Sequence, residues 1–256
     1  MKVVILAAGF GTRLAEETRF KPKPLVEIGE QPILWHIMKI YSHFGFNEFI
    51  ICLGYKGFMI KEYFYSYFLQ KCDVSFNLRT QEMEIHQNRV EPWRVTLVDT
   101  GINTKTGGII KKIQPYLEDQ PFMLTYADGV SDINIRALVQ YHYAHGKIAT
   151  VTAVQPSGRF GSMPLREDDS VESFQEKPAG DGAWINGGFF VLEPAVFSHI
   201  RDEQTVFERE PLQQLAQANQ LQAFKHTGFW QPMDTLHEKT MLEGLWSSGW
   251  APWKVW

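Results

Sequence analysis

Positive charge follows a glycine-rich segment near the start of the chain. Residues 6–14 read Leu-Ala-Ala-Gly-Phe-Gly-Thr-Arg-Leu. Small residues let a backbone approach a ligand closely, and its N–H groups can then bind phosphate oxygens. Four cationic residues fall within eleven positions, namely Arg13, Arg19, Lys21 and Lys23. Pro22 and Pro24 restrict the backbone around Lys23, so the segment can hold one ammonium near bound phosphate at a low entropic cost.

Two known phosphate loops do not fit this segment. A Walker A loop requires Gly-x-x-x-x-Gly-Lys-Ser/Thr, which is absent, and the dinucleotide pattern Gly-x-Gly-x-x-Gly fails because position 14 is leucine. A glycine-rich turn without a ligand, followed by a solvated patch of lysines, remains the alternative explanation.

The elements around this segment alternate between short apolar runs and stretches of helical period. This alternation is typical of an α/β domain with a mostly parallel sheet. Strands are expected at residues 3–6, 49–53, 95–99, 122–126, 149–154, 171–175 and 188–192, and helices at 32–44, 58–69, 133–145 and 235–247. The glycine-rich segment directly follows the first strand, where open α/β sheets bind their ligands.

Length and composition predict one ordinary globular domain. The chain has 256 residues, of which 44% are hydrophobic and 21% charged. The net charge of −4 gives no overall basic field for a nucleic acid partner. Cys52 lies in an apolar run, which favours a buried thiol and a reducing compartment. No apolar run approaches the length of a signal sequence or a membrane span, so we expect a soluble protein with no membrane partner.

The motifs resemble one family over the whole chain, the sugar-nucleotide pyrophosphorylases, also called sugar-1-phosphate nucleotidyltransferases. The segments Gly9–Leu14 and Lys21–Pro24 carry this resemblance. It implies a single Rossmann-like nucleotidyltransferase domain over residues 1–256, with a mixed, mostly parallel sheet. It also implies a magnesium-dependent enzyme that joins a nucleoside triphosphate to a sugar 1-phosphate and releases pyrophosphate.

The likeness is greatest to the members of that family that use CTP and glucose 1-phosphate. The segments that carry it are 91–93, 97–101, 174–178, 185–190, 229–235 and 251–254. The resemblance therefore implies these two substrates. UTP or dTTP in place of CTP, and a non-catalytic relative that only senses nucleotide or sugar phosphate, are the alternatives.

The resemblance also implies roles for individual residues. The expected nucleotide-binding residues are Leu6, Ala7, Ala8, Gly9, Gly11, Thr12, Arg13 and Lys23, of which Arg13 and Lys23 are expected to be catalytic. The sugar-phosphate oxygen that attacks the α-phosphorus is already an anion, so the reaction needs no general base. Catalysis then depends on positioning and on charge neutralisation.

Two distant aspartates are expected to hold Mg²⁺. Asp128 ends a predicted strand and Asp234 precedes the last predicted helix. Read alone, they are a turn residue and a helix-start residue. In the family that this chain resembles, the two are magnesium ligands.

The sugar phosphate is expected to contact Gly161, Glu176, Lys177, Asn186 and Gly187. The resemblance assigns Lys177 to the phosphate and Glu176 to sugar hydroxyls. The alternatives are a solvated strand end for residues 176–177 and a tight turn for Asn186-Gly187.

The chain departs from the pattern of the similar cytidylyltransferases at three positions. Ala8 and Ala127 replace glycines, and Ile109 stands where the similar cytidylyltransferases carry an arginine that helps hold nucleotide phosphate. Lys111 or Lys112 are the candidates to replace that arginine.

The remaining expectations concern assembly and the ends of the domain. The resemblance implies a cytoplasmic homo-oligomer. Residues 78–94 have weak patterning and could extend outside the core. A C-terminal helix and tail cover residues 235–256, where the tryptophans are expected to pack against the domain or a neighbouring subunit rather than a membrane.

Overall fold

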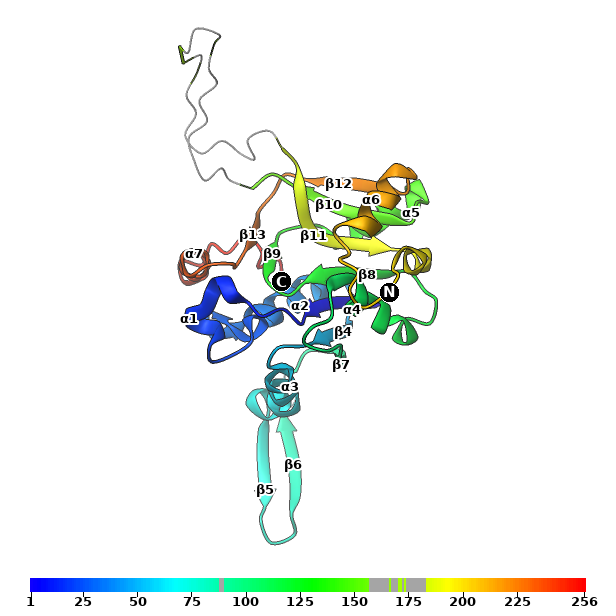
Figure 1. Cartoon of the computed structure of the whole chain (residues 1–256). Coiled ribbons are helices and arrows are strands. Elements are labelled where there is room, and N and C mark those ends of the chain that lie inside the picture. Colours follow the sequence, from blue (N-terminus) through cyan, green and yellow to red (C-terminus); the bar gives the residue numbers. More distant parts are fainter. Residues whose placement is uncertain (88–89, 157–165, 167–169, 172, 174–182) are drawn as a thin grey trace.

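A seven-stranded sheet forms the centre of the protein (Figure 1). The computed structural model describes residues 1–87, 90–156, 166, 170–171, 173 and 183–256. The strand order is β12-β10-β11-β8-β1-β4-β7. These strands are β1 (Val3–Ala7), β4 (Glu48–Leu53), β7 (Arg94–Asp99), β8 (Phe122–Tyr126), β10 (Ala149–Val154), β11 (Ile185–Leu192) and β12 (Leu221–His226).

Parallel pairing dominates this sheet. β1 pairs in parallel with β4 and β8, β4 with β7, and β10 with β12, whereas β11 runs antiparallel to both β8 and β10. The expected α/β class with a mixed, mostly parallel sheet is confirmed.

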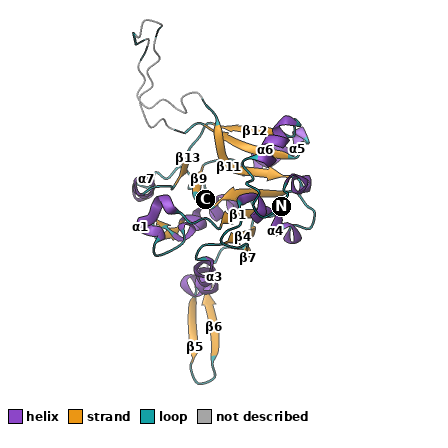
Figure 2. Cartoon of the chain, in the orientation of Figure 1, coloured by secondary structure: helices purple, strands orange, loops and turns teal. Residues whose placement is uncertain are grey.

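Helices cover both faces of the sheet (Figure 2). They are α1 (Ala15–Thr18), α2 (Ile33–His43), α3 (Gly57–Lys71), α4 (Thr106–Lys112), α5 (Ile135–His145), α6 (Glu210–Gln217) and α7 (Leu236–Ser247). Alternate residues of β1 enter two separate hydrophobic clusters: Val3 and Ile5 pack with α2, and Val4 and Leu6 pack with α4. A strand buried on both faces reads as one continuous apolar run, which is why the sequence revealed it.

Most of the predicted elements are confirmed within a few residues. The structure adds α4, α6 and β12, which the sequence pattern did not indicate. Two adjacent glycines weaken the helical signal of α4, and β12 is an edge strand with only partly buried residues. The strand expected at 171–175 falls largely outside the described residues.

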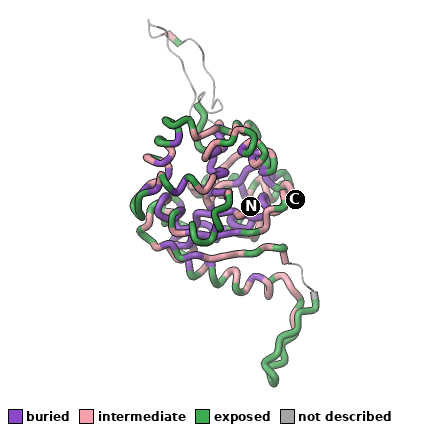
Figure 3. The backbone as a smooth tube through the Cα atoms, turned by 90° about the vertical axis from the view of Figure 1, so that its right-hand side faces the viewer, coloured by how far each residue is buried: buried purple, intermediate pink, exposed green. Residues whose placement is uncertain are grey.

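A two-stranded hairpin projects from the body of the protein (Figure 3). It consists of β5 (Asp73–Asn77) and β6 (Glu82–Gln87), which pair with each other. The projection therefore begins at residue 73 rather than 78, and Arg94 already belongs to the central sheet as the first residue of β7. Phe76, Met83 and Ile85 are exposed on this hairpin.

The C-terminal tail packs back onto α2. Trp253 is fully buried, and its indole nitrogen donates to His36 Nδ1 at 3.3 Å. His36 Nε2 lies 2.8 Å from the carbonyl oxygen of Ile28, so the buried imidazole is neutral and donates from Nε2. Trp246 lies edge-on to the same imidazole. The expectation of packing against the domain is met by Trp246 and Trp253, whereas Trp250 is exposed.

Among the described residues, no helix is both long enough and apolar enough to cross a membrane.

Burial of His36 predicts a pH dependence of stability. Desolvation, together with the charge of Lys254, lowers the pKa of His36 from 6.5 to about 4. Below pH 6.5 His36 binds a proton in the unfolded chain, whereas in the folded chain it does so only near pH 4. The contribution of His36 to the free energy of unfolding should therefore be constant above pH 6.5. It should fall by roughly 3 kcal/mol as the pH drops to 4.

Urea unfolding followed by tryptophan fluorescence at several pH values would measure this loss. Carboxylates titrate in the same range, so the His36→Gln variant isolates the histidine: its stability should depend less on pH between 6.5 and 4. His43→Gln, on the exposed face of the same helix, is the matched control and should follow the parent. Equal slopes in the parent and His36→Gln would refute the assignment.

Candidate active site

The glycine-rich segment forms a tight loop at the carboxyl end of β1. Gly11 has a φ of +64°, and a Cβ there would lie 2.7 Å from Cγ2 of Thr18 and 3.1 Å from Cβ of Lys23. Both the backbone conformation and the space therefore require glycine. The Thr18 hydroxyl closes the loop by donating to the carbonyl oxygen of Gly11 at 3.0 Å.

Lys23 starts a short 3-10 helix directly behind this loop. Pro22 is extended before it, and the Val26 N–H donates to the Lys23 carbonyl after it. The lysine is 8% exposed, so its ammonium must find partners inside the protein. The prolines on either side of Lys23 therefore restrict a buried lysine and not one on a solvated surface.

A short antiparallel pair brings the two predicted aspartates together. β9 (Gly129–Ser131) pairs with β13 (Trp230–Pro232), and Pro232 lies opposite Gly129. The Met233 N–H donates to the carbonyl oxygen of Asp128 at 2.8 Å. Asp128 and Asp234 therefore extend from opposite strands at the same end of this pair.

The start of α7 fixes the backbone of Asp234. Thr235 caps the helix, and Glu238 reaches back so that one carboxylate oxygen, Oε2, accepts from the N–H groups of Asp234 and Thr235 at 2.7 and 2.8 Å. This is a capping box. The sequence pattern Thr-x-x-Glu could have identified Glu238, which the sequence analysis missed.

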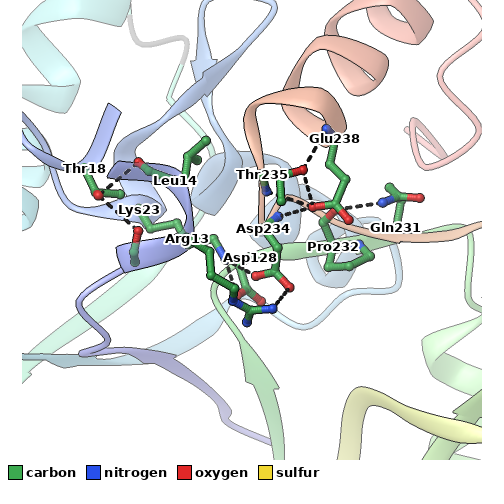
Figure 4. A network of polar contacts seen from close by, with 11 residues as sticks. Arg13, Leu14, Thr18, Lys23, Asp128, Gln231, Pro232, Asp234, Thr235 and Glu238 are labelled. Atoms are coloured by element: carbon green, nitrogen blue, oxygen red, sulfur yellow. Dashed lines mark hydrogen bonds and ion pairs between the residues drawn. The ribbon is translucent and has the colours of Figure 1, made fainter. Parts of the chain in front are cut away.

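Both aspartates converge on Lys23 (Figure 4). Lys23 Nζ lies 2.7 Å from Asp128 Oδ2 and 2.6 Å from Asp234 Oδ1. Arg13 Nη1 lies 2.7 Å from Asp234 Oδ2, although the arginine side chain is 70% exposed. Two carboxylates and two cations thus form one charge cluster beside the loop.

The cluster borders a cavity of about 230 Å³. Its wall includes most of the residues expected to bind nucleotide. The lining residues are Leu6, Ala7, Gly9, Gly11, Thr12, Arg13, Lys23, Pro24, Ala127 and Asp128. Ala8 does not line the cavity and is buried. Arg19 and Lys21 are not among these residues, and Lys21 pairs with Glu27 at 2.8 Å.

The described sugar-side residues lie on β11. Asn186-Gly187 is part of this strand and not a turn, but the register with β10 shifts here, and Gly188 has a φ of +82°. Such irregularities re-aim side chains, often beside active sites. Gly187 and Gly188 line a second small pocket together with Asp128. Gly161, Glu176 and Lys177 lie outside the described residues.

Ile109 belongs to the hydrophobic core. Its side chain is 5% exposed and packs in the cluster between α4 and the sheet. Lys111 Nζ donates to the carbonyl oxygens of Ile200 and Arg201 at 2.7 and 2.6 Å. Lys112 Nζ lies 3.1 Å from the Thr100 carbonyl oxygen and 3.0 Å from Glu203. Both lysines therefore have partners of their own within the protein.

The carboxylate pair suits a hard divalent cation. The described residues contain no group of three or more His, Cys, Asp or Glu side chains that could hold a metal. Two carboxylates completed by phosphate oxygens and water are the usual ligands of magnesium. In this structure the ammonium of Lys23 sits between the two carboxylates, in the position where a cation can be shared.

Comparisons with known proteins show which family the chain resembles over its length. The family model described as "Nucleotidyl transferase" matches residues 2–239. The chain is 59% identical to a glucose-1-phosphate cytidylyltransferase of Salmonella typhimurium and 44% identical to a probable glucose-1-phosphate cytidylyltransferase of Bacillus subtilis, in each case over 100% of both chains. A crystal structure of apo UDP-glucose pyrophosphorylase superposes with a TM-score of 0.69 at 16% identity, covering 97% of this chain and 98% of that one. This last likeness concerns the fold alone.

The charge cluster predicts a strong dependence of stability on Lys23. Lys23→Met would leave two mostly buried carboxylates side by side without their shared cation. Without divalent ions, we expect the free energy of unfolding to fall by about 3 kcal/mol, as measured by urea denaturation.

Two comparisons test the cause of this loss. Arg13→Gln removes the exposed cation of the same cluster and should cost less than about 1 kcal/mol. In an Asp128→Asn, Asp234→Asn background, Lys23→Met should cost much less than in the parent. The shared-cation account would be wrong if Lys23→Met cost the same in both backgrounds.

Proposed function

Because this chain belongs to the nucleotidyl transferase family, we propose that it transfers the cytidylyl group of CTP to α-D-glucose 1-phosphate, forming CDP-glucose and pyrophosphate. Full-length identity of 59% to a glucose-1-phosphate cytidylyltransferase supports these two substrates. The sequence resemblance and the family model point to the same reaction class.

The convergence of Asp128 and Asp234 on Lys23 carries this proposal. Asp128 and Asp234 lie 105 and 211 positions from Lys23 in the sequence, yet both contact its ammonium beside the loop that follows β1. A purely structural role for the aspartates, as turn and helix-start residues, does not require them to meet. A triphosphate site requires both carboxylates for a metal and cations for the phosphate oxygens.

We propose that the loop and the cations bind the triphosphate. A Cβ at Gly9 would meet no atom within 4 Å, so the backbone there has open space in front of it. Arg13 is exposed enough to turn from Asp234 to a phosphate oxygen. Lys23 would then face the charge that develops at the α-phosphorus, which makes Arg13 and Lys23 the proposed catalytic residues.

The sugar phosphate is proposed to bind on the β11 side. Asn186 is exposed and directly precedes Gly187, which lines a pocket together with Asp128. Carboxamide and backbone groups suit sugar hydroxyls. Lys177 is proposed to bind the phosphate, with Glu176 and Gly161 contacting the sugar.

Asp128 and Asp234 are proposed to hold magnesium. Their carboxylate oxygens are already within hydrogen-bond distance of one common cationic atom, which fits the donor set of that ion. When bound, magnesium supplies positive charge to the triphosphate. Lys23 would then be released from the two carboxylates and become available to the phosphate oxygens.

The reaction needs positioning rather than a protein nucleophile. A phosphate oxygen of glucose 1-phosphate forms a bond to the α-phosphorus of CTP while the bond from that phosphorus to the bridging oxygen breaks, and pyrophosphate leaves with the electron pair. The incoming oxygen is an anion, so no side chain has to remove a proton. Arg13 and Lys23 hold the phosphates in line and neutralise the charge that builds up.

The first prediction from the proposed function concerns substrate choice. Among CTP, UTP, dTTP and ATP, assayed with glucose 1-phosphate and magnesium, CTP should give the highest kcat/KM for pyrophosphate release. Faster turnover with UTP or dTTP would overturn the cytidylyl assignment and keep the reaction class. Binding without any turnover would favour the non-catalytic alternative.

The second prediction treats the two aspartates as one unit. Asp128→Asn or Asp234→Asn keeps the size of the side chain but removes one anionic ligand, so kcat should fall by at least about 10²-fold. Because residues that act together are not additive, the double variant should be little worse than the poorer single one. Losses that multiply, or near-parent turnover in either single variant at saturating magnesium, would contradict a shared ion.

Two further proposals concern the setting of the enzyme. We propose a homo-oligomer, supported by the exposed apolar residues of the β5–β6 hairpin and of α3, including Phe58 and Tyr65. Light scattering should give a mass above the 29.5 kDa of one chain. We also propose a cytoplasmic location, which fits the use of CTP.

A further inference from the structure

A line of side-chain hydrogen bonds runs from Asn186, which is proposed to bind the sugar, to the start of α4. Asn186 Nδ2 lies 3.3 Å from the hydroxyl of Tyr126, at the end of β8. That hydroxyl lies 2.6 Å from Glu208 Oε1. The other carboxylate oxygen, Oε2, accepts from the Thr106 hydroxyl at 2.6 Å, at the start of α4.

Glu208 determines which group donates along this line. An ionised carboxylate only accepts hydrogen bonds, so the Tyr126 hydroxyl must donate to it. The tyrosine oxygen can then only accept, and Asn186 must present its NH₂ group to it. The other end of the carboxamide agrees, because Asn186 Oδ1 accepts from the Gly188 N–H at 2.8 Å. The carboxamide therefore has one orientation.

Tyr126 is well suited to transmit this constraint. A phenol hydroxyl can donate one hydrogen bond and accept another, so Tyr126 can join Glu208 to Asn186. Its ring fills the space beside Gly188, where a Cβ would lie 2.6 Å from Cδ2 of the tyrosine. The ring thus packs directly against the irregular part of β11 that carries Asn186.

Glu208 is itself held in place. The Phe207 N–H donates to the Thr106 hydroxyl at 2.9 Å, and the Gly107 N–H donates to the carbonyl oxygen of Thr205 at 2.9 Å. These bonds attach the segment before Glu208 to the first turn of α4. The Glu208 carboxylate is therefore held in place at the end of the hydrogen-bonded line that lies away from Asn186.

We propose that Glu208 is a positioning residue that orients Asn186, through Tyr126, for binding of the sugar phosphate. The inference rests on the proposed function, because that function makes Asn186 a sugar-binding residue. Glu208 contacts neither substrate in this account. Asn186 keeps one N–H and one oxygen lone pair for sugar hydroxyls, and Glu208 determines where each of them is presented.

Steady-state kinetics of the full-length protein test this role. Glu208→Gln can either donate or accept, so it no longer imposes a direction on Tyr126. We expect the KM for glucose 1-phosphate to rise about fivefold, the worth of roughly one hydrogen bond, with the KM for CTP changed less than about twofold. Tyr126→Phe should have the same effect, and Glu208→Gln should add little to it.

Glu210→Gln is the matched control. It is the same substitution two residues along the chain, where the carboxylate pairs with Arg201 on the surface. Both KM values should stay at the parent level in this variant. Equal increases in the two KM values for Glu208→Gln, or additive losses with Tyr126→Phe, would mean a structural role only and would overturn the proposal.

A spectroscopic measurement separates this inference from the proposed function. In protein labelled with ¹⁵N-asparagine, the side-chain amide signal of Asn186 can be assigned by its loss in Asn186→Asp. This signal should shift in Glu208→Gln and in Tyr126→Phe, and stay unchanged in Glu210→Gln. An unshifted signal in Glu208→Gln would overturn the orienting role even in an active enzyme. If the parent formed no CDP-glucose, the function would fail while a shifted signal still supported the orienting role.

Discussion

The sharing of one ammonium by two carboxylates is the constraint around which the site is organised. Lys23 is buried, so its charge requires Asp128 and Asp234, and those carboxylates in turn require a cation between them. The β9–β13 pair, the capping box at the start of α7 and the loop at Gly11 all serve this one meeting point. A disturbance in any of them leaves charge uncompensated inside the protein.

The loop and the buried lysine of the candidate site could be predicted from the sequence because their signals are local. Residues 6–14 and Lys23 lie close together in the chain, and the loop follows a strand that is apolar on both faces. Asp128 and Asp234 needed the family resemblance, since the β9–β13 pair that joins them is only three residues long on each strand. Strands this short leave no periodicity to detect.

The local structure around Asn186 was less predictable for a different physical reason. Asn186-Gly187 has the composition of a turn, yet pairing with β10 keeps it within a strand. The hydrogen bonds from Asn186 to Thr106 join residues up to 102 positions apart, and no pattern in the sequence relates them. Ile109 was also hard to place from the sequence. It packs in the core as part of α4, and the sequence pattern did not reveal that helix.

The packing of the tail onto α2 has a consequence for the order in which the protein matures on the ribosome. Arg13 and Lys23 are synthesised early, but Asp234 follows Lys23 by 211 residues, and α7 behind it is covered by Trp253. A nascent chain that has not yet released Trp253 lacks the side chain that packs against both Trp246 and His36. Lys23 lacks one of its two carboxylates until Asp234 has emerged, and the helix that follows Asp234 gains its packing against Trp253 only later.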